Sequence, residues 1–414
     1  MHCPRVGLRR LASRAFSTSA SVSKPLLVLG LESSADDSCA SIVSSSREIL
    51  SNVVLKQSQI HESFGGIHPL HAQEAHQRNL PLAIKLALER ARVSLDDLDG
   101  IAFTRGPGMY GCLSVCTGAA KALAAATGKP LLGVHHMQAH ALTPFLTASD
   151  DCPAPAFPFL TLLLSGGHTL LVLCTAVDRF RILATTHDES IGQSFDKAAR
   201  DLEIPWDLGA GSPGAALEAF AFGRPGAGEG DKGETLRRHE FPVPFRHQLA
   251  FSYAGLRSAL TRILGRESSE SSSDEAGALF STERKRELAR GFMVAAFEQV
   301  EGKVALGLDH LAREGEVGPI RGLVVSGGVA SNLYLRKRLR KKLDEVSSSR
   351  SGRETIPLHF PPPALCTDNA AMVAWVGLER LRRGRVDPLD VMQQSKWAID
   401  ECEADFSVVV EPPK

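Results

Sequence analysis

The stretch L-L-V-L-G-L-E-S-S-A-D-D-S-C-A-S-I-V, residues 26 to 43, decides the fold. Two apolar runs flank a polar segment of small and acidic residues, which predicts a strand, a turn and a second strand. The same arrangement returns as F-L-T-L-L-L-S-G-G-H-T-L-L-V-L-C at residues 159 to 174. An internal duplication of one strand-turn-strand unit is the economical explanation. It predicts an α/β protein built from two related domains.

Two further glycine-rich turns follow predicted strands. The turn R-G-P-G-M-Y-G (105 to 111) opens a predicted helix that runs through Ala126, and S-G-G-V-A-S-N (326 to 332) leads into a helical run from Leu333 to Leu343. Backbone N–H groups in such turns and at helix N-termini form concave sites for anions. Each turn alone is as typical of a structural role as of binding. Several of them, each placed after a strand, predict a phosphate-binding cleft between two α/β domains.

Three histidines lie in the short segment V-H-H-M-Q-A-H, residues 134 to 140. On a helix, His136 and His140 share one face, while His135 is rotated about 100° away from them. The pair therefore has the spacing of metal ligands. A zinc peptidase would carry Glu beside its first histidine, in the motif H-E-x-x-H. Met137 occupies that position here, so the base of the peptidase mechanism is missing, and the third ligand that a catalytic site normally needs must come from elsewhere.

Length and composition predict an ordinary globular protein. The chain has 414 residues, a formal net charge of zero and 43% apolar residues, which allows two domains of typical size. A neutral chain has no global field that would attract nucleic acid, so RNA would have to be bound by local patches. No apolar run reaches the ~20 residues of a membrane span, so no membrane insertion is expected. The cysteines are scattered without a C-x-x-C pair, which indicates buried free thiols and a reducing compartment.

The first 24 residues differ in composition from the rest. They are rich in arginine and serine, and no acid precedes Glu32, which is typical of a mitochondrial transit peptide and predicts a location in the matrix. A disordered basic tail is the alternative. The segments 223 to 240, 265 to 283 and 346 to 355 are of low complexity and are predicted to be surface loop insertions.

Taken together, these residues resemble one family closely, the tRNA threonylcarbamoyladenosine transferases, once named O-sialoglycoprotein endopeptidases. The matching motifs run in family order from about Leu26 to Trp375. They are L-G-L-E-S-S-A-D-D-S (29 to 38), G-P-G-M-Y-G (106 to 111), V-H-H-M-Q-A-H (134 to 140), S-G-G-H-T (165 to 169), F-D-K-A-A-R (195 to 200), F-S-Y-A-G-L-R (251 to 257), S-G-G-V-A-S-N (326 to 332) and C-T-D-N-A-A-M (366 to 372).

The resemblance implies the actin/Hsp70/sugar-kinase fold, in which two duplicated α/β domains surround a nucleotide-binding cleft. Residues 1 to 24 would be the transit peptide. The N-terminal domain would span residues 25 to 145 and be joined by a C-terminal helix over 369 to 383. The C-terminal domain would span residues 146 to 365.

The resemblance also implies a metal site. One divalent ion per subunit, iron or zinc, would be held by His136, His140 and Asp368. From the residues alone, Asp368 is instead predicted to be the N-cap of the helix over 369 to 383, a role that Asp often fills.

The implied reaction transfers a threonylcarbamoyl group from threonylcarbamoyl-AMP, which a separate synthetase makes, to N6 of the adenosine 3′ of the anticodon. The substrates would be mitochondrial tRNAs reading codons that begin with A. Glu32 and Asp36 are tentative general bases, with solvated turn acids as the alternative. The substrate-binding residues carried over from the family are Leu163, Leu164, Ser165, Gly166 and Gly167 for the phosphate and carbamoyl groups, Asp196 for the ribose, Asn332 for the nucleotide, and Gly214 or Gly211 for a nucleotide contact.

Several alternatives stay open at this point. His61, His68, His71 and His76 could form a second metal site, although an amphipathic helix surface is the better interpretation. The basic segments 336 to 342 and 380 to 385 could contact tRNA phosphates or be solvated helix faces. Rival functions are a small-molecule kinase of the same fold, a metallopeptidase, and an ATP-binding scaffold that maintains the mitochondrial genome or a protein assembly. The family's mitochondrial branch implies a homodimer.

Overall fold

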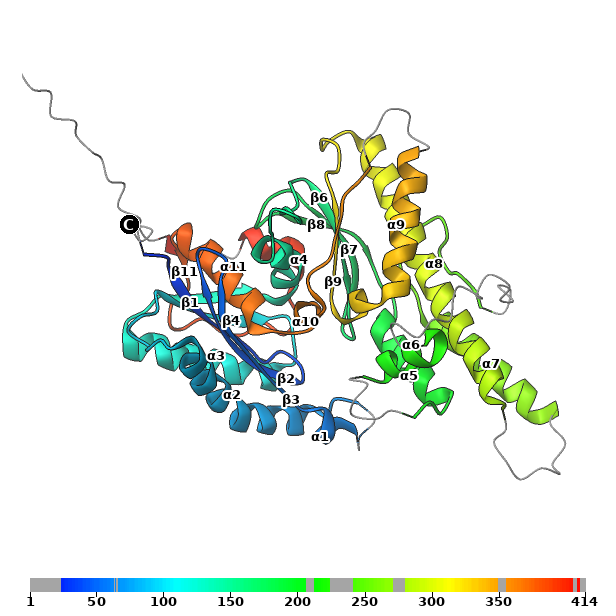
Figure 1. Cartoon of the computed structure of the whole chain (residues 1–414), viewed down its shortest axis with the longest axis horizontal. Helices are drawn as coiled ribbons and strands as arrows, with labels where there is room; N and C mark the ends of the chain where they lie inside the picture. Colours follow the sequence, from blue (N-terminus) through cyan, green and yellow to red (C-terminus); the bar gives the residue numbers. More distant parts are fainter. Residues whose placement is uncertain are drawn as a thin grey trace, which may run out of the picture.

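The structure is a computed structural model that describes residues 24–62, 64, 66–205, 212–223, 241–270, 280–348, 355–404 and 408–409. Two five-stranded sheets form its framework, each covered by helices (Figure 1). Among the described residues, no helix combines the length and the apolar character needed to cross a membrane.

The first sheet has the strand order β3-β2-β1-β4-β5. Strands β1, β2 and β3 are antiparallel neighbours, and β4 and β5 run parallel to β1. β1 is buried along its whole length, which explains why its sequence is continuously apolar up to the acid that ends it. The five strands are β1 (Leu27–Glu32), β2 (Asp37–Ser44), β3 (Ile49–Lys56), β4 (Gly100–Gly106) and β5 (Leu131–His135).

The second sheet repeats this topology. Its order, taken from the far edge, is β8-β7-β6-β9-β10, with β6, β7 and β8 antiparallel and with β9 and β10 parallel to β6. The repeat confirms the predicted duplication, and with it the α/β class and the actin/Hsp70/sugar-kinase fold. The five strands are β6 (Phe159–Leu164), β7 (Thr169–Cys174), β8 (Phe180–Thr185), β9 (Leu323–Ser326) and β10 (Leu358–His359).

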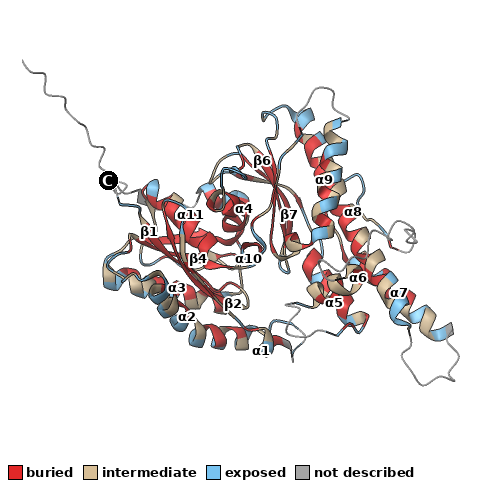
Figure 2. Cartoon of the chain, in the orientation of Figure 1, coloured by how far each residue is buried: buried red, intermediate tan, exposed pale blue. Residues whose placement is uncertain are grey.

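Two helices, α4 (His136–Leu146) and α11 (Ala370–Arg382), lie between the sheets (Figure 1). Their side chains share one apolar cluster with residues of β1, β5, β6 and β7, and nearly every residue of both helices is buried (Figure 2). A helix that is apolar on all sides must be covered on all sides. Among the described helices, α4, which carries His136 and His140, and α11, which begins two residues after Asp368, are thus almost fully enclosed.

The outer faces of the sheets are covered by other helices. The first sheet packs on α2 (Pro69–Ala91) and α3 (Tyr110–Thr127), and α1 (Ser58–Glu62) precedes α2. The second sheet packs on a larger group of helices that share a separate core. These are α5 (Ile191–Asp201), α6 (Pro213–Phe222), α7 (Ala254–Glu270), α8 (Thr282–Glu314) and α9 (Leu333–Ser348).

The predicted loop insertions are shorter than expected wherever the structure describes them. Helix α7 continues to Glu270, α8 begins at Thr282, and α9 continues to Ser348, so the edges of the segments 265 to 283 and 346 to 355 are helical. The serine and charged residues that indicated loops are compatible with exposed helix ends. Residues 224 to 240, most of the remaining insertion, lie outside the described residues, as do residues 1 to 23 of the predicted transit peptide.

Short elements complete the fold near the cleft. A 3-10 helix, η1 (Gly328–Ser331), connects β9 to α9, and α10 (Pro363–Cys366) comes just before α11. Beyond α11, the chain forms β11 (Arg385–Val386), the 3-10 helix η2 (Ile399–Ala404) and β12 (Val408–Val409).

Candidate metal and nucleotide site

His135 fixes the start of α4 and so aims the two histidines that follow it. Its Nδ1 accepts hydrogen bonds from the backbone N–H groups of Met137 at 3.1 Å and Gln138 at 3.4 Å, and its Nε2 donates to the carbonyl of Trp397 at 3.1 Å. Burial lowers the pKa of His135 to about 3, so this imidazole is neutral. As predicted, His135 points away from the face that His136 and His140 share.

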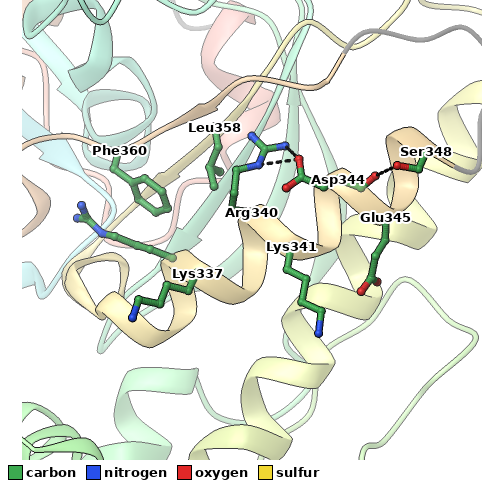
Figure 3. A pocket seen from close by; sticks show the side chains of 9 residues that line it. Lys337, Arg340, Lys341, Asp344, Glu345, Ser348, Leu358 and Phe360 are labelled. Carbon is green, nitrogen blue, oxygen red and sulfur yellow. Dashed lines mark hydrogen bonds and ion pairs between the residues drawn. The ribbon is translucent and has the colours of Figure 1, made fainter. Parts of the chain in front are cut away.

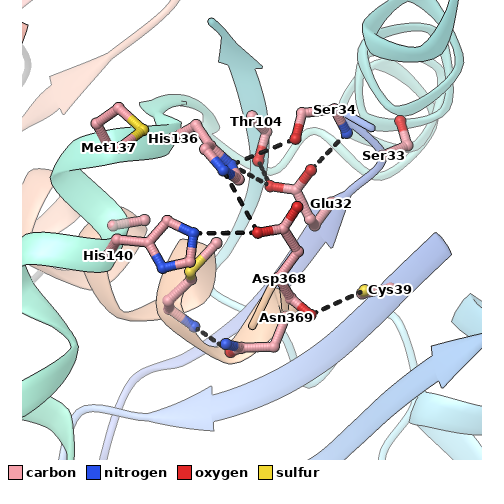
Figure 4. Close-up of polar contacts among 12 residues, drawn as sticks. Glu32, Ser33, Ser34, Cys39, Thr104, His136, Met137, His140, Asp368 and Asn369 are labelled. Atoms are coloured by element: carbon pink, nitrogen blue, oxygen red, sulfur yellow. Dashed lines mark hydrogen bonds and ion pairs between the residues drawn. The ribbon is translucent and has the colours of Figure 1, made fainter. Parts of the chain in front are cut away.

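Asp368 meets that face from the junction between α10 and α11 (Figure 4). Its Oδ1 lies 3.1 Å from Nε2 of His140 and 3.5 Å from Nε2 of His136. The prediction that Asp368 caps the following helix is wrong, because the side chain of Asn369 accepts the hydrogen bond from Met372 N–H at 3.0 Å. Asn and Asp are nearly equivalent as caps, so the neighbouring Asn leaves Asp368 free to face the histidines.

Glu32 ends β1 directly behind His136. Its Oε2 accepts hydrogen bonds from His136 Nδ1 at 2.9 Å and from the Thr104 hydroxyl at 2.5 Å, while its Oε1 accepts from Ser34 N–H at 2.5 Å. The carboxyl is fully buried, which by itself raises its pKa, but the charge and hydrogen bond of His136 outweigh burial and the net pKa is lowered. Because His136 donates through Nδ1, its Nε2 is left available on the side of His140 and Asp368.

These residues fit a metal ion. Ligand atoms of His136, His140 and Asp368 all lie within 4.8 Å of one another. In a tetrahedral site with bonds of about 2.1 Å, ligand atoms are separated by roughly 3.4 Å, close to the two distances from Asp368. Burial lowers the pKa of His136, but Glu32 and Asp368 outweigh it and raise that pKa to about 9, so the cluster attracts positive charge. Two imidazoles and a carboxylate suit zinc or iron.

Met137 is buried in the apolar cluster between the sheets. It occupies the place where H-E-x-x-H carries its general base. The carboxylate nearest to the histidines, apart from Asp368, is that of Glu32, and hydrogen bonds engage both of its oxygens. The arrangement therefore disfavours the peptidase alternative.

Glu32→Gln is expected to weaken metal binding 10- to 100-fold, the usual cost of losing a partner that orients a ligand. An amide places a donor where the carboxylate accepts from Ser34, Thr104 and His136, so the ring of His136 is no longer held. Competition of the purified protein with a chromogenic zinc chelator measures the affinity. The exposed Glu89→Gln on α2 is the matched control, and equal affinities for both variants would contradict the orienting role.

Asp36 lies in the turn between β1 and β2. Burial, and secondarily the charge of Asp368, raise its pKa to about 6, while burial and the charge of Asp36 raise the pKa of Asp37 to about 7. A carboxyl with a pKa near neutrality is suited to accepting a proton at physiological pH. The general-base role of Asp36 stays a prediction, and this pKa supports it.

His76 of α2 holds the turn between β1 and β2 in place. Its Nε2 donates to the carbonyl of Ala35 at 3.0 Å, and its Nδ1 lies 2.8 Å from the hydroxyl of Ser38 and 3.1 Å from Nε2 of Gln57. Gln57 in turn bonds to His61 at 3.1 Å. His61 and His76 are buried, so the interpretation of all four histidines as helix surface is wrong for these two. In the described part of the chain, the metal-type cluster is that of His136, His140 and Asp368.

His76→Gln is expected to make stability less sensitive to acid. Burial lowers the pKa of His76 below its ordinary value of about 6.5, so below that pH the unfolded state binds more protons and the free energy of unfolding falls. Without His76, the decrease between pH 7 and pH 5 should be shallower by up to about 1.4 kcal/mol per pH unit. Urea unfolding at several pH values measures this slope. An unchanged slope in His76→Gln would contradict the account.

The turn after β6 is held in shape by hydroxyl groups. The Ser165 hydroxyl accepts from the N–H groups of Gly167 and His168 at 3.3 and 3.1 Å, and the Ser190 hydroxyl donates to the carbonyl of Gly166 at 2.6 Å. Gly166 and Gly167 are exposed, whereas Leu163 and Leu164 are buried within β6 and support the turn. The start of α5 packs closely here, since a Cβ on Gly192 would lie 2.7 Å from the Ser165 carbonyl oxygen.

This turn lies close to the metal-type residues. Burial, and then the charges of His136 and His140, lower the pKa of His168 to about 4, an influence that requires proximity. His168 stands in one of the matching motifs but was not among the predicted site residues.

The remaining predicted substrate residues lie on helices of the second sheet. Asp196 of α5 accepts a hydrogen bond from Gly214 N–H at 2.8 Å, and burial raises its pKa. Gly214 is thus placed beside Asp196, while Gly211 lies outside the described residues. Asn332 is buried, and its side chain accepts from Leu335 N–H at 2.8 Å at the start of α9.

Comparisons with known proteins show what this chain is similar to. The family profile described as tRNA N6-adenosine threonylcarbamoyltransferase matches residues 48–375. The probable mitochondrial tRNA N6-adenosine threonylcarbamoyltransferase of Arabidopsis thaliana is 36% identical over 381 residues, which are 92% of this chain and 74% of the relative. The tRNA N6-adenosine threonylcarbamoyltransferase of Cereibacter sphaeroides is 38% identical over 384 residues, covering 92% of this chain and 96% of the relative. Among solved structures, HypF of T. kodakarensis superposes with a TM-score of 0.49 and 14% identity, over 87% of this chain and 49% of that one.

Proposed function

Because the chain belongs to the tRNA N6-adenosine threonylcarbamoyltransferase family, we propose that it transfers the threonylcarbamoyl group of threonylcarbamoyl-AMP to N6 of the adenosine 3′ of the anticodon. The observation that carries the proposal is the convergence of His136, His140 and Asp368 beside the amide-rich turn at Ser165–Gly167. A kinase of this fold would need the turn but would have no use for the histidine pair.

In this proposal each part of the site has one task. His136, His140 and Asp368 hold one divalent ion, iron or zinc, which supplies Lewis-acid and template chemistry for the threonyl group when bound. Glu32 keeps His136 oriented. The exposed turn of Gly166 and Gly167, supported by Leu163, Leu164 and Ser165, binds the phosphate. Asp196 binds the ribose, and Gly214 and Asn332 lie along the nucleotide.

The reaction forms a bond between adenine N6 and the carbamoyl carbon and breaks the mixed anhydride, so that AMP departs. N6 loses one proton in the process, and we assign its acceptance to Asp36 because both oxygens of Glu32 are already engaged. Adenine N6 is a weak nucleophile. Most of the acceleration must therefore come from holding the reactants together and from stabilising the charge of the departing phosphate at the turn.

The cellular setting is also part of the proposal. The basic first 24 residues and the mitochondrial relative support a location in the mitochondrial matrix and mitochondrial tRNA substrates that read codons beginning with A. A separate synthetase would supply threonylcarbamoyl-AMP. A homodimer is supported by exposed apolar side chains near the start of α2, namely Phe64, Ile67 and Leu70.

The proposed domain limits follow the two sheets. Residues 25–145 would form the first domain together with α11, which packs on β1, and residues 146–365 the second. Limited proteolysis with mass spectrometry of the fragments would locate the boundary.

The test is nucleoside mass spectrometry of an unmodified tRNA reading a codon that begins with A. The tRNA is incubated with the protein, an active low-molecular-weight synthetase, ATP, threonine and bicarbonate. Threonylcarbamoyladenosine is expected only when protein and synthetase are both present, and a tRNA without adenosine 3′ of its anticodon should stay unmodified. No product, with the synthetase shown to make its adenylate, would overturn the proposal for the chain acting alone.

A further inference from the structure

A basic groove lies on the second sheet's side of the molecule, between helix α9 and the strand segment that contains Leu358 and Phe360 (Figure 3). Its volume is about 920 Å³. It lies outside the set of residues that the proposed reaction uses. The lining residues that the argument needs are Arg336, Lys337, Arg340, Lys341 and Phe360.

Two lysines give the groove its free positive charge. Lys337 and Lys341 are exposed, one helical turn apart, and extend from the same side of α9 (Figure 3). Neither has an ion-pair partner within the described part of the chain. Arg340 differs, because Asp344 pairs with it at 2.8 Å. The free positive charge therefore comes from Lys337 and Lys341, and Lys337 is the one nearer to Phe360 (Figure 3).

Arg336 connects this end of the groove to η1. Its guanidinium lies 4.3 Å from the ring centroid of Phe360, and its Nε donates to the carbonyl of Ala330 in η1 at 2.8 Å. Its Nη2 also lies 3.7 Å from Sγ of Cys366, two residues before Asp368. The basic end of the groove thus lies against η1 and against Cys366, which precedes Asp368 by two residues.

The other basic segment, residues 380 to 385, offers less free charge. Arg380 pairs with Asp387 at 2.8 Å, Arg382 and Arg383 each pair with Glu379 at 3.0 Å, and Arg385 pairs with Asp178 at 3.5 Å. Two segments were predicted as possible phosphate contacts. Of these, the one on α9 carries lysines that have no ion-pair partner in the described part of the chain.

We propose that the groove along α9 binds the phosphodiester backbone of the RNA substrate and leads it toward the cleft. The inference rests on the proposed function, since it names a second contact for the same substrate. Lysine ammonium groups bind phosphate oxygens as point charges, without regard to base sequence. The groove therefore contributes affinity and orientation, and the choice of adenosine is made in the cleft.

The experiment measures equilibrium binding of a fluorescently labelled tRNA by anisotropy at several salt concentrations. Lys337→Gln/Lys341→Gln is expected to bind about tenfold more weakly at low salt and to lower the slope of log K against log salt by about 1.5, because each lost phosphate contact removes about 0.7 to 0.9. Lys85→Gln/Lys129→Gln removes the same charge from the first sheet's side and should bind like the unmodified protein. Urea unfolding should be little changed in both variants, because Lys85, Lys337 and Lys341 are exposed and Lys129 makes only a solvent-exposed hydrogen bond to the Asp96 carbonyl.

The possible outcomes separate the inference from the proposed function. The inference would be overturned if the α9 variant kept the salt slope of the unmodified protein. It would also be overturned if both variants lost the same affinity for tRNA. If a labelled polyglutamate peptide bound through Lys337 and Lys341 and tRNA could not displace it, the inference would also be overturned, in favour of an acidic protein partner. Binding can be measured without turnover. If the protein binds tRNA through the two lysines but makes no threonylcarbamoyladenosine, the proposed function is overturned and the inference about the groove is retained.

Discussion

His140→Ala is expected to lower the formation of threonylcarbamoyladenosine at least about 100-fold and to reduce bound metal well below one ion per chain. Loss of a partner behind a ligand costs 10- to 100-fold, and loss of the ligand itself costs at least as much. His140 is buried on α4 with its Nε2 3.1 Å from Asp368, so the remaining pair would be His136 and Asp368 alone. Nucleoside mass spectrometry gives the product, and elemental analysis of the purified protein gives the metal.

The matched control for this variant is His310→Ala. His310 lies on α8, where its half-buried side chain pairs with Glu314 at 3.0 Å. It should keep both activity and metal content. Full transfer activity by His140→Ala at normal metal content would contradict the assignment of the site, whereas lost activity with full metal content would make His140 a substrate contact.

The same variant separates the rival functions. A small-molecule kinase or an ATP-binding scaffold of this fold would depend on the glycine turns and would tolerate the loss of His140. A metallopeptidase would also lose activity with His140, but it would need a general base where the buried Met137 stands. The transferase is the proposal that requires the metal-type residues and the amide turn together, because its reaction joins a threonyl group to a nucleotide phosphate.

The duplicated strand-turn-strand units could be predicted from sequence because each is a local pattern. Buried strands appear as continuous apolar runs, and small residues mark the turns between them. The shared face of His136 and His140 could also be predicted, because helix periodicity depends only on local spacing.

The parts of the site that joined distant segments could not be predicted from the residues. Asp368 and Asn369 are both good helix caps, and only the position of α4 across from α11 decides which of them turns toward the histidines. The sequence placed Glu32 at the start of a polar turn, where it was predicted to be a general base. In the structure it is buried behind His136 and bonds to Nδ1 of that histidine. His76 looked like helix surface because its partners, Ala35, Ser38 and Gln57, belong to other elements.

Gly30→Ala is expected to destabilise the protein by about 3 kcal/mol or more and to weaken metal binding at the same time. Gly30 lies in β1 under α11, and an added Cβ would lie 2.3 Å from the Ala370 carbonyl oxygen and 2.7 Å from the Ala374 nitrogen. These are backbone atoms of a buried helix, so no side chain can rotate to make room. The helix would have to move, and Asp368 lies only two residues before Ala370.

Urea unfolding and the chelator competition measure the two effects, and Gly302→Ala is the control. Gly302 lies within α8 with open space around it, so alanine there should raise stability by about 0.5 to 1 kcal/mol through helix propensity. The same chemical change is thus expected to have opposite signs at the two sites. Unchanged stability in Gly30→Ala would contradict the close packing of α11 on β1. Lost stability with unchanged metal affinity would show instead that Asp368 keeps its place when α11 shifts, and that the contact with His140 holds it more firmly than the helix does.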